Sequence, residues 1–460
     1  MKSELIKKLL GAKADRLVSG LELVFSTDSR SLGEANAFIC LYGERFDAFD
    51  LIEGLSTTKI KVIFYEDKPG REALVSELSK THADLPQCIG VPNIFDFLLE
   101  MGSLAGQKFK ENGGKIIGLT GSNGKTTNKE MLAWLLEGLF PNEVLWTKGN
   151  LNNHIGVPLT LLRLQSSHRI AIIEMGTNHP GEIEVLARTA APTVGMITNV
   201  GHAHLEFLKD LKGVFQEKTA LFREVEKNED SLLIINEFDR FLKTYQERGA
   251  SFRLSPDNFI INKSNEVSFS LVFNNQKLIV KNSSLLGNHQ KTNMGQCLAL
   301  CLKMFPNKIE PLVHLANSFE MPAMNRGDLL KYKSAEVFLD AYNANPDSMK
   351  ASLESFKELA RDRGVSMSDC LFVLGDMNEL GEQACSQHRE LGKFLSSLGG
   401  QNAIFIGQYG EEYKKGFGEA QFFSTGALAK KAIDNHSFSL AFIKGSRSLQ
   451  LESILAIKEE

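Results

Sequence analysis

The sequence lacks the features that would place it in a secreted, membrane-spanning or nucleic-acid-binding class. Its six cysteines are scattered through 460 residues without paired spacing, which argues against a disulfide framework and a zinc site. No apolar run approaches the ~18 residues of a membrane-spanning helix. The N-terminus, MKSELIKKLLGAKADRL, carries charges throughout, unlike a signal peptide. The net charge of −4 gives no reason to expect a nucleic-acid partner. We therefore expect a soluble, cytoplasmic protein.

The length and composition of the chain predict several globular domains. At roughly 100–200 residues per domain, the chain should form two to four. With 43% hydrophobic and 23% charged residues, each domain can bury a core. A polar, glycine-bearing stretch at 110–116 is a plausible linker, and a third unit starts near Arg326. We expect three α/β domains, over residues 1–110, 111–324 and 325–460.

The pattern of the middle third predicts a mostly parallel sheet covered by helices. Apolar strands are expected at 115–121, 168–176, 193–201 and 230–237, and segments of helical spacing lie between them. Alternating strands and helices imply a parallel sheet with both faces covered. Residues 251–287 instead alternate apolar and polar residues with turns between, which predicts antiparallel strands. Cys297 and Cys301, four residues apart, are expected on the buried face of a helix.

The last third repeats the strand-then-helix pattern. Segments that read as a strand followed by a turn are expected at 335–346, 369–377, 402–410 and 440–446, and helical stretches such as SMKASLESFKELARDRG lie between them. This is a second α/β array, and we expect a Rossmann-like domain.

The segment GLTGSNGKTT, residues 118–127, resembles a phosphate-binding loop with one irregularity. The general pattern G-x-x-x-x-G-K-[ST] would place its first glycine at position 119, where this chain has Leu119. A glycine loop between a strand and a helix presents backbone N–H groups and the positive end of the helix dipole to a phosphate. Lys125 would add a positive charge, and Thr126 would offer a hydroxyl to Mg²⁺. The alternative is a glycine-rich turn that happens to contain Lys-Thr.

Polar side chains follow the next two strands of the expected sheet. Glu174 ends an apolar run, at the sheet edge where open α/β sheets bind ligands. A carboxylate there is a hard oxygen ligand for Mg²⁺, although it could also simply face water. His202 and His204 lie just past the following strand. Two histidines in a polar turn favour a site, but the pattern alone does not say which one is used.

Seven segments occur in the order found in the Mur ligases, which the chain resembles over essentially its whole length. They are TGSNGKTT, GNLNNHIGVPLTLL, EMGTNHPGEI, TNVGHAHLE, EKTALF, DAYNANPDSM and IKGSR. The loop of this family has the shorter form G-x-x-G-K-T-[ST], which Gly121, Gly124, Lys125, Thr126 and Thr127 match. The irregularity at position 119 is then no defect.

The resemblance implies an ATP-dependent, Mg²⁺-using ligase of peptidoglycan precursor synthesis. The motifs fit best the members that join D-alanyl-D-alanine to UDP-N-acetylmuramoyl-tripeptide through an acyl phosphate, giving the pentapeptide, ADP and phosphate. A carboxylate acylates poorly until phosphorylation gives it a good leaving group, and the transfer needs mainly positioning and charge neutralisation. We expect a monomer whose domains close over the acyl phosphate and exclude water.

The resemblance also implies roles for individual residues. The catalytic set is Lys125, Lys218, His204 and Arg326. The ATP-binding set is Thr120, Gly121, Ser122, Asn123, Gly124, Lys125, Thr126, Thr127, Asn293, Arg326 and Asp340. The metal ligands are Thr126, Glu174 and His204. The substrate-binding set is Ser29, Arg30, Asn150, Asn152, Asn153, Tyr342, Asn343 and Asn345.

Several of these roles have ordinary alternatives. Lys218 matches a lysine that the family carries as a carbamate, whereas most helix lysines are solvated. Arg326 could be a surface arginine of a linker, and the segment YNANP could be only a tight turn. His289-Gln290 departs from the family's usual His-Asn, which puts the geometry of adenine contact in doubt.

Other functions remain open at this point. The preceding ligase, which adds a diamino residue, usually carries a D-N-P-[RK] motif that this chain lacks. A folylpolyglutamate-type ligase would need its own motifs. A P-loop ATPase or kinase would need a strand ending in an aspartate, but the strands after the loop end in Glu174 and in the turn at 201–204. A non-catalytic binding protein would require a broken metal site.

Overall fold

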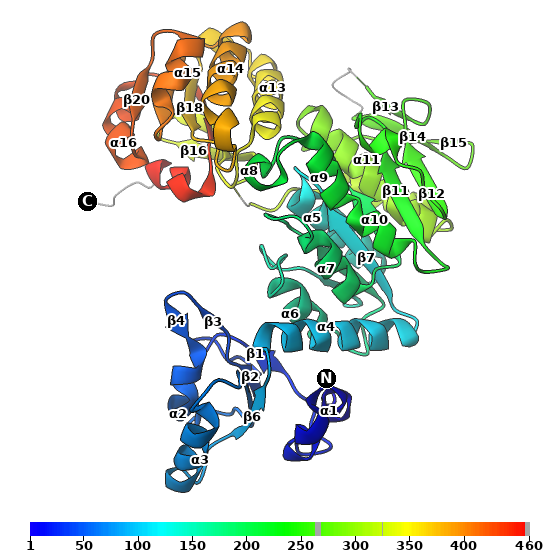
Figure 1. The fold of residues 1–460 in the computed structure, drawn as a ribbon. Coiled ribbons are helices and arrows are strands. Elements are labelled where there is room, and N and C mark those ends of the chain that lie inside the picture. Colours follow the sequence, from blue (N-terminus) through cyan, green and yellow to red (C-terminus); the bar gives the residue numbers. More distant parts are fainter. Residues whose placement is uncertain (263–267, 324, 456–460) are drawn as a thin grey trace.

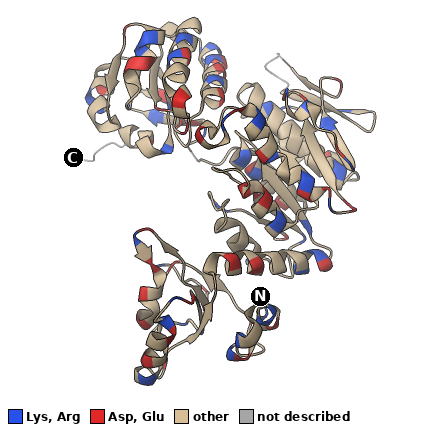
Figure 2. Ribbon diagram, in the orientation of Figure 1, with Lys and Arg blue, Asp and Glu red and all other residues tan. Residues whose placement is uncertain are grey.

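The structure, a computed structural model, describes residues 1–262, 268–323 and 325–455. The chain forms three α/β lobes, and it passes from the first to the second through one long helix (Figure 1). Basic residues (Lys and Arg) and acidic residues (Asp and Glu) are spread over all three lobes (Figure 2). Within the described ranges, no helix combines the length and apolar character that crossing a membrane requires.

The N-terminal lobe contains a four-stranded parallel sheet in the order β1-β2-β5-β6, with a short hairpin of β3 and β4. Its elements are α1 (Ser3–Leu10), β1 (Phe25–Ser26), β2 (Ala37–Ile39), β3 (Tyr42–Gly43), β4 (Phe46–Asp47), α2 (Ile52–Leu55), β5 (Val62–Glu66), α3 (Arg71–Thr81), β6 (Gln87–Val91) and α4 (Ile94–Glu111). Asn93 caps α4 by accepting from the backbone N–H groups of Phe95 and Asp96. Helix α4 packs on α6 (Gly156–Leu161) and α7 (Glu182–Ala190) of the next lobe. Because it ends at Glu111 and β7 begins at Lys115, the polar stretch 110–116 contributes only a short turn.

The central lobe is built on a six-stranded parallel sheet in the order β12-β11-β10-β7-β9-β8. Its parallel-sheet elements are β7 (Lys115–Thr120), α5 (Lys125–Leu139), β8 (Val144–Trp146), α6 (Gly156–Leu161), β9 (Ile170–Glu174), α7 (Glu182–Ala190), β10 (Val194–Ile197), α8 (Leu205–Leu208), α9 (Leu211–Lys218), α10 (Ala220–Val225), β11 (Leu232–Asn236) and β12 (Ala250–Leu254). The strand order reverses at β7, so the carboxyl ends of β9, β7 and β10 lie side by side at the place where such sheets bind ligands.

The rest of the central lobe is an antiparallel ribbon followed by two helices. These elements are β13 (Phe259–Ile261), β14 (Phe269–Phe273), β15 (Gln276–Val280), α11 (Gly287–Met304) and α12 (Ile309–Asn317). The prediction of antiparallel strands over 251–287 is confirmed for this ribbon and wrong for β12, which pairs parallel to β11. Alternation of apolar and polar residues indicates that a strand has one buried face, but it does not indicate the direction of the strand. Part of that segment, 263–267, lies outside the described residues.

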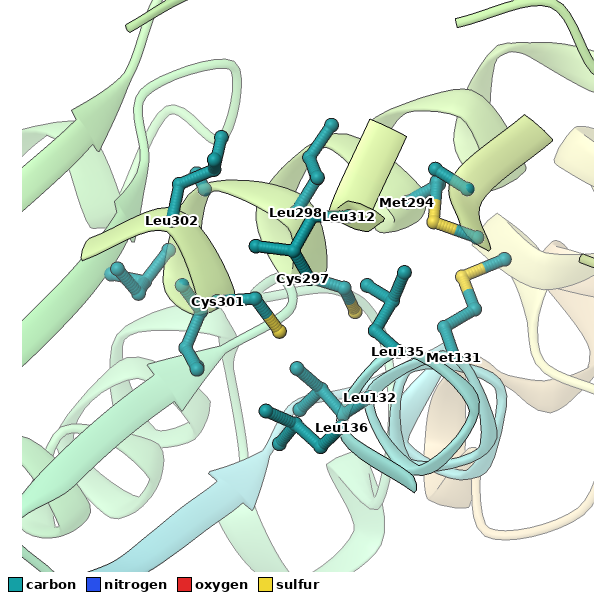
Figure 3. Close-up of a cluster of buried hydrophobic side chains, with 14 of the residues drawn as sticks. Met131, Leu132, Leu135, Leu136, Met294, Cys297, Leu298, Cys301, Leu302 and Leu312 are labelled. Carbon is teal, nitrogen blue, oxygen red and sulfur yellow. The ribbon is translucent and has the colours of Figure 1, made fainter. Parts of the chain in front are cut away.

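Two apolar cores cover the two faces of the central sheet. One lies between the sheet, α5, α11 and α12, and Figure 3 shows its interdigitating Met, Leu and Cys side chains. Cys297 and Cys301 are fully buried there, as predicted. The other lies between the sheet, α7 and α10. All six cysteines carry free thiols.

The C-terminal lobe has a six-stranded sheet in the order β16-β17-β21-β18-β19-β20, parallel except for β16. Its elements are β16 (Asp328–Tyr332), β17 (Ala335–Asp340), α13 (Pro346–Asp362), β18 (Leu371–Gly375), α14 (Ala384–Ser397), β19 (Asn402–Ile406), α15 (Gly410–Phe417), β20 (Gln421–Phe423), α16 (Gly426–Asn435) and β21 (Leu440–Lys444). The predicted α/β array is confirmed. The proposed domain boundary at 324 lies outside the described residues.

Candidate active site

A cavity of about 850 Å³ is lined by both the central and the C-terminal lobes. Sixteen of the predicted site residues line it: Ser122, Asn123, Gly124, Lys125, Thr126, Thr127, Asn150, Asn152, Asn153, Glu174, His204, Asn293, Arg326, Asp340, Tyr342 and Asn343. The structure therefore brings together residues that the sequence separates by more than 200 positions.

The phosphate loop occupies the tight turn between β7 and α5. Gly124 adopts a left-handed conformation at the N-cap of α5, and no side chain caps the helix. The N–H groups of its first turn have no intrahelical partner, so they are available to an anion. The amine of Lys125 donates to the carbonyl of Gly121 at 2.7 Å, and desolvation lowers its pKa.

The geometry explains why glycine stands at position 121 and leucine at position 119. A Cβ on Gly121 would lie 1.8 Å from Oγ1 of Thr198, at the end of the neighbouring β10. Only glycine permits this approach of the two strands. Leu119 is a fully buried strand residue of the core between the sheet and α5. Position 119 therefore belongs to the strand and not to the loop.

Glu174 ends β9 as predicted, and its carboxylate is almost completely buried. Its Oε1 accepts from the hydroxyl of Thr126 at 3.2 Å and from the amide of Asn152 at 2.8 Å. Among the residues that the structure describes, its Oε2 has no hydrogen-bond partner, and the amine of Lys129 lies 3.9 Å away. A buried, half-satisfied carboxylate oxygen is costly without a further partner.

These donors fit a magnesium ion that is shared with a nucleotide. Among the described residues, no group of three or more His, Cys, Asp or Glu side chains could hold a metal by itself. Mg²⁺, however, is commonly held by one or two carboxylates together with water and substrate phosphates. The hydroxyl of Thr126 and the free Oε2 of Glu174, beside a phosphate-type loop, satisfy that requirement.

The two histidines of the turn after β10 have different partners. His202 donates its backbone N–H to Asp347 of the C-terminal lobe at 2.6 Å, and its Nδ1 lies 3.0 Å from the same carboxylate. Nδ1 of His204 lies 2.5 Å from Oε2 of Glu379, also in the C-terminal lobe. The two groups are close enough for an ion pair but are not aligned as a hydrogen bond. Burial lowers the pKa of His204, which favours the neutral imidazole that binds metals. His204 therefore fits a ligand role better than His202 does.

Lys218 is the last residue of α9 and is fully buried. Its amine has no hydrogen-bond partner, and burial lowers its pKa well below the usual value. It does not line the cavity. The ordinary alternative, a solvated helix lysine, is wrong for this residue.

The C-terminal lobe contributes a cluster at the ends of β17 and β21. The carboxylate of Asp340 accepts from the amine of Lys444 at 2.6 Å and from the hydroxyl of Ser352 at 2.8 Å. The guanidinium of Arg326 lies over the ring of Tyr342 at 3.9 Å, and its buried Nε has no hydrogen-bond partner within the described part of the chain. An arginine with unused donors on a cavity wall suits a phosphate.

The remaining predicted residues have other positions. The hydroxyl of Thr120 donates to the carbonyl of Met175 beneath the loop. Asn345 caps α13 and donates to the side chain of Asn123 at 2.6 Å, so it joins the phosphate loop to the C-terminal lobe. Ser29 and Arg30 lie in the N-terminal lobe and do not line the cavity. Arg30 is exposed and pairs with Asp28.

Sequence reasoning missed several residues of this region, among them four charged ones. Lys444 pairs with Asp340, Asp347 with His202 and Glu379 with His204, while the buried amine of Lys129 lies 3.3 Å from the carbonyl of Gly149. Lys444 lies in the predicted strand-then-turn segment LAFIKGS, so its position could have been noticed. The other three could not be identified from sequence, because the groups they contact lie in other segments of the chain.

Two family models match the chain. The Mur ligase middle domain covers residues 119–301, and the Mur ligase glutamate ligase domain covers residues 325–435. A protein of Escherichia coli named UDP-N-acetylmuramoyl-tripeptide–D-alanyl-D-alanine ligase is 30% identical over 452 residues, which cover 95% of this chain and 93% of that protein. The protein of the same name from Haemophilus influenzae is 29% identical over 450 residues, 94% of this chain and 92% of that protein.

Solved structures agree in fold. MurF from Acinetobacter baumannii has a TM-score of 0.83 and 25% identity, covering 98% of this chain and 97% of that one. MurF ligase from Thermotoga maritima, solved in complex with ADP, has a TM-score of 0.77 and 23% identity, covering 94% and 96% of the two chains. The chain belongs to the Mur ligase family, and its relatives include proteins named UDP-N-acetylmuramoyl-tripeptide–D-alanyl-D-alanine ligase.

Proposed function

We propose that the protein is an ATP-dependent ligase that joins D-alanyl-D-alanine to UDP-N-acetylmuramoyl-tripeptide, giving the pentapeptide, ADP and phosphate. The observation that carries this proposal is the cavity. Its wall combines a phosphate-type loop, a buried carboxylate and an arginine from a second domain. That arrangement suits phosphoryl transfer to a second bound substrate.

The reaction has two steps. An oxygen of the tripeptide carboxylate attacks the γ-phosphorus of ATP, the bond from that phosphorus to the bridging oxygen breaks, and ADP leaves. The amine of D-alanyl-D-alanine then attacks the acyl carbon and loses a proton, and phosphate leaves with the carboxylate oxygen. Because both steps develop charge on phosphate oxygens, positioned cations contribute most of the catalysis.

The loop residues and the opposite wall of the cavity would contact the bound nucleotide from two sides. The N–H groups of the first turn of α5 and the amine of Lys125 would hold the terminal phosphates, and Arg326 would approach from the other side. Asn293, beside Gly124, and Asp340 complete the proposed ATP contacts. Thr126, Glu174 and His204 would hold Mg²⁺, which neutralises phosphate charge when bound.

Lys218 is proposed to act as a carbamate. A lysine amine must be neutral to combine with CO₂, and burial favours that form. The carbamate would be an anion beside the cationic site, and it would give the unpartnered nitrogen of Lys218 a chemical role.

The muramoyl substrate is proposed to extend from the cavity towards the N-terminal lobe. Asn150, Asn152 and Asn153 lie on the cavity wall, and Asn152 also holds Glu174. Ser29 and Arg30, in the proposed UDP-binding domain of residues 1–110, would meet the uridine end. Tyr342, Asn343 and Asn345 are proposed for the second substrate. We propose that the protein acts as a cytoplasmic monomer.

The test is phosphate release from Mg²⁺-ATP by purified protein. Release should require both UDP-muramoyl-tripeptide and D-alanyl-D-alanine, and mass spectrometry should find the pentapeptide. Release with UDP-muramoyl-dipeptide and a diamino acid would instead assign the preceding step. ATP hydrolysis at a rate that does not depend on any muramoyl substrate would refute the proposed ligase activity. Lys125→Ala should abolish release while leaving the fold intact.

A further inference from the structure

The contact between His204 and Glu379 joins two domains at the proposed metal site. His204 follows β10 of the central lobe, whereas Glu379 follows β18 of the C-terminal lobe. Nδ1 of the imidazole lies 2.5 Å from the carboxylate, so Nε2 is on the opposite edge of the ring. His204 also lines the cavity.

The segment that carries Glu379 is fixed from behind by buried groups. The backbone N–H of Met377 donates to Nε2 of the fully buried His388 at 2.9 Å. The hydroxyl of Ser446 donates to the carbonyl of Asp376 and accepts from the N–H of Asn378. Glu379 is therefore presented by a rigid support, even though its own side chain is partly exposed.

The backbone on both sides of the contact is unusual. His204 has φ +55° and Glu379 has φ +61°, and neither residue is glycine. The N–H of Glu206 donates to the carbonyl of Glu379 at 3.2 Å. A Cβ on Gly381 would lie 3.4 Å from Cα of Glu206. Left-handed residues of this kind persist where the surroundings enforce them, often at functional sites.

We propose that Glu379 is a positioning residue that orients His204 for the proposed metal site when the C-terminal domain docks. A carboxylate 2.5 Å from Nδ1 favours the tautomer with its proton on that nitrogen, because the N–H carries positive charge next to the anion even though the two groups are not aligned as a hydrogen bond. The lone pair of Nε2 is then free as a ligand. Carboxylates commonly hold metal-binding histidines in this way. Here the carboxylate comes from the other domain, so domain docking and ligand orientation are coupled. The inference deepens the proposed function and rests on it for the role of His204.

The test is the affinity of the full-length protein for Mn²⁺ in the presence of ADP, measured from the free Mn²⁺ signal by electron paramagnetic resonance. Glu379→Ala should raise the Mn²⁺ Kd about 10–100-fold. Glu379→Gln should raise the Kd less, because its amide oxygen can still lie beside Nδ1 but carries no full negative charge. Glu382→Gln, an exposed carboxylate of the same segment, is the matched control and should match wild type.

A double-mutant cycle separates orientation from folding. In a His204→Ala background, Glu379→Ala should have no further effect on the Mn²⁺ Kd. A purely structural role of Glu379 would lower the melting temperature and leave the Mn²⁺ Kd unchanged. Unchanged Kd in both Glu379 variants, or an equal effect of Glu382→Gln, would overturn the inference.

Ligase assays distinguish this inference from the proposed function. If wild type joins the two substrates and the Glu379 variants match it in Mn²⁺ affinity, the function stands and the inference falls. If wild type makes no pentapeptide but Glu379→Ala still weakens Mn²⁺ binding, the inference stands and the substrate assignment falls. Wild type that binds no Mn²⁺ with ADP would overturn the inference, whatever its activity.

Discussion

At the scale of single residues, the least ordinary group is the amine of Lys218. It is fully buried without a hydrogen-bond partner, although an uncompensated buried ammonium is among the costliest groups in a protein. The sequence pointed to Lys218 only through a family motif. The structure adds the physical reason: burial supplies the neutral amine that carbamate formation requires.

The carbamate can be tested by chemical rescue. Lys218→Ala should lose ligase activity, because the side-chain anion is gone. Short-chain carboxylates should restore part of it by occupying the space of the carbamate. Lys212→Ala, on the exposed side of the same helix α9, is the control and should keep its activity. Full activity of Lys218→Ala without additive would refute the role.

Lys218 should also make stability depend on pH. Its pKa is lowered in the folded state, so above that pKa the unfolded chain binds one more proton and stability rises with pH. In CO₂-free buffer, Lys218→Met should be more stable than wild type near neutral pH. The difference in free energy of unfolding between the variant and wild type should shrink by about 1.4 kcal/mol per pH unit as the pH approaches the pKa of lysine in the unfolded chain, about 10.4.

Denaturant unfolding of both proteins across pH measures this advantage. Lys212→Met provides the comparison for an exposed lysine and should show no such trend. An advantage of Lys218→Met that stays constant or grows with pH would contradict a neutral buried amine.

At the scale of elements, the sequence predicted the strand–loop–helix units well and the sheet edges poorly. Long apolar strands such as β7, β9 and β18 are buried on both faces, so their composition alone reveals them. The three-residue strands β8 and β20, and the antiparallel β16, were not predicted. Short edge strands have too few residues to show a period, and their direction depends on a neighbour that local sequence does not specify.

The phosphate loop depends on the close approach of the strands on either side of it. Gly121→Ala should destabilise the protein by about 1–3 kcal/mol through overpacking against Thr198, and it should also weaken nucleotide binding. In a Thr198→Ala background the cost should be smaller, because the nearest atom is gone. Chemical unfolding and ADP titration of the four proteins measure the coupling. Additive effects would show that the contact with Thr198 does not select glycine.

At the scale of the whole molecule, the site exists only when two domains meet. His202 and Asp347 are 145 residues apart in the chain, and Asn123 and Asn345 are 222 apart. Each residue has an ordinary local interpretation, as a turn histidine, a helix-start carboxylate, a loop amide or a helix cap. Sequence could therefore predict the two walls of the cavity from their motifs, but not the contacts that join them.

Asp347 gives the most direct test of that closure. It accepts from the backbone N–H of His202 and lies within 3.0 Å of its Nδ1. Because both side chains are about one-third exposed, its loss should cost about 1 kcal/mol, roughly a fivefold shift of the docking equilibrium. Asp347→Ala should then show a larger mean radius of gyration by small-angle X-ray scattering and a several-fold higher KM for ATP. Asp362→Ala, at the far end of the same helix α13, should match wild type in both. If the radius and the KM of Asp347→Ala also match wild type, this ion pair does not hold the domains together, and closure rests on other contacts between the lobes, such as those of Asn123, His204 and Glu206.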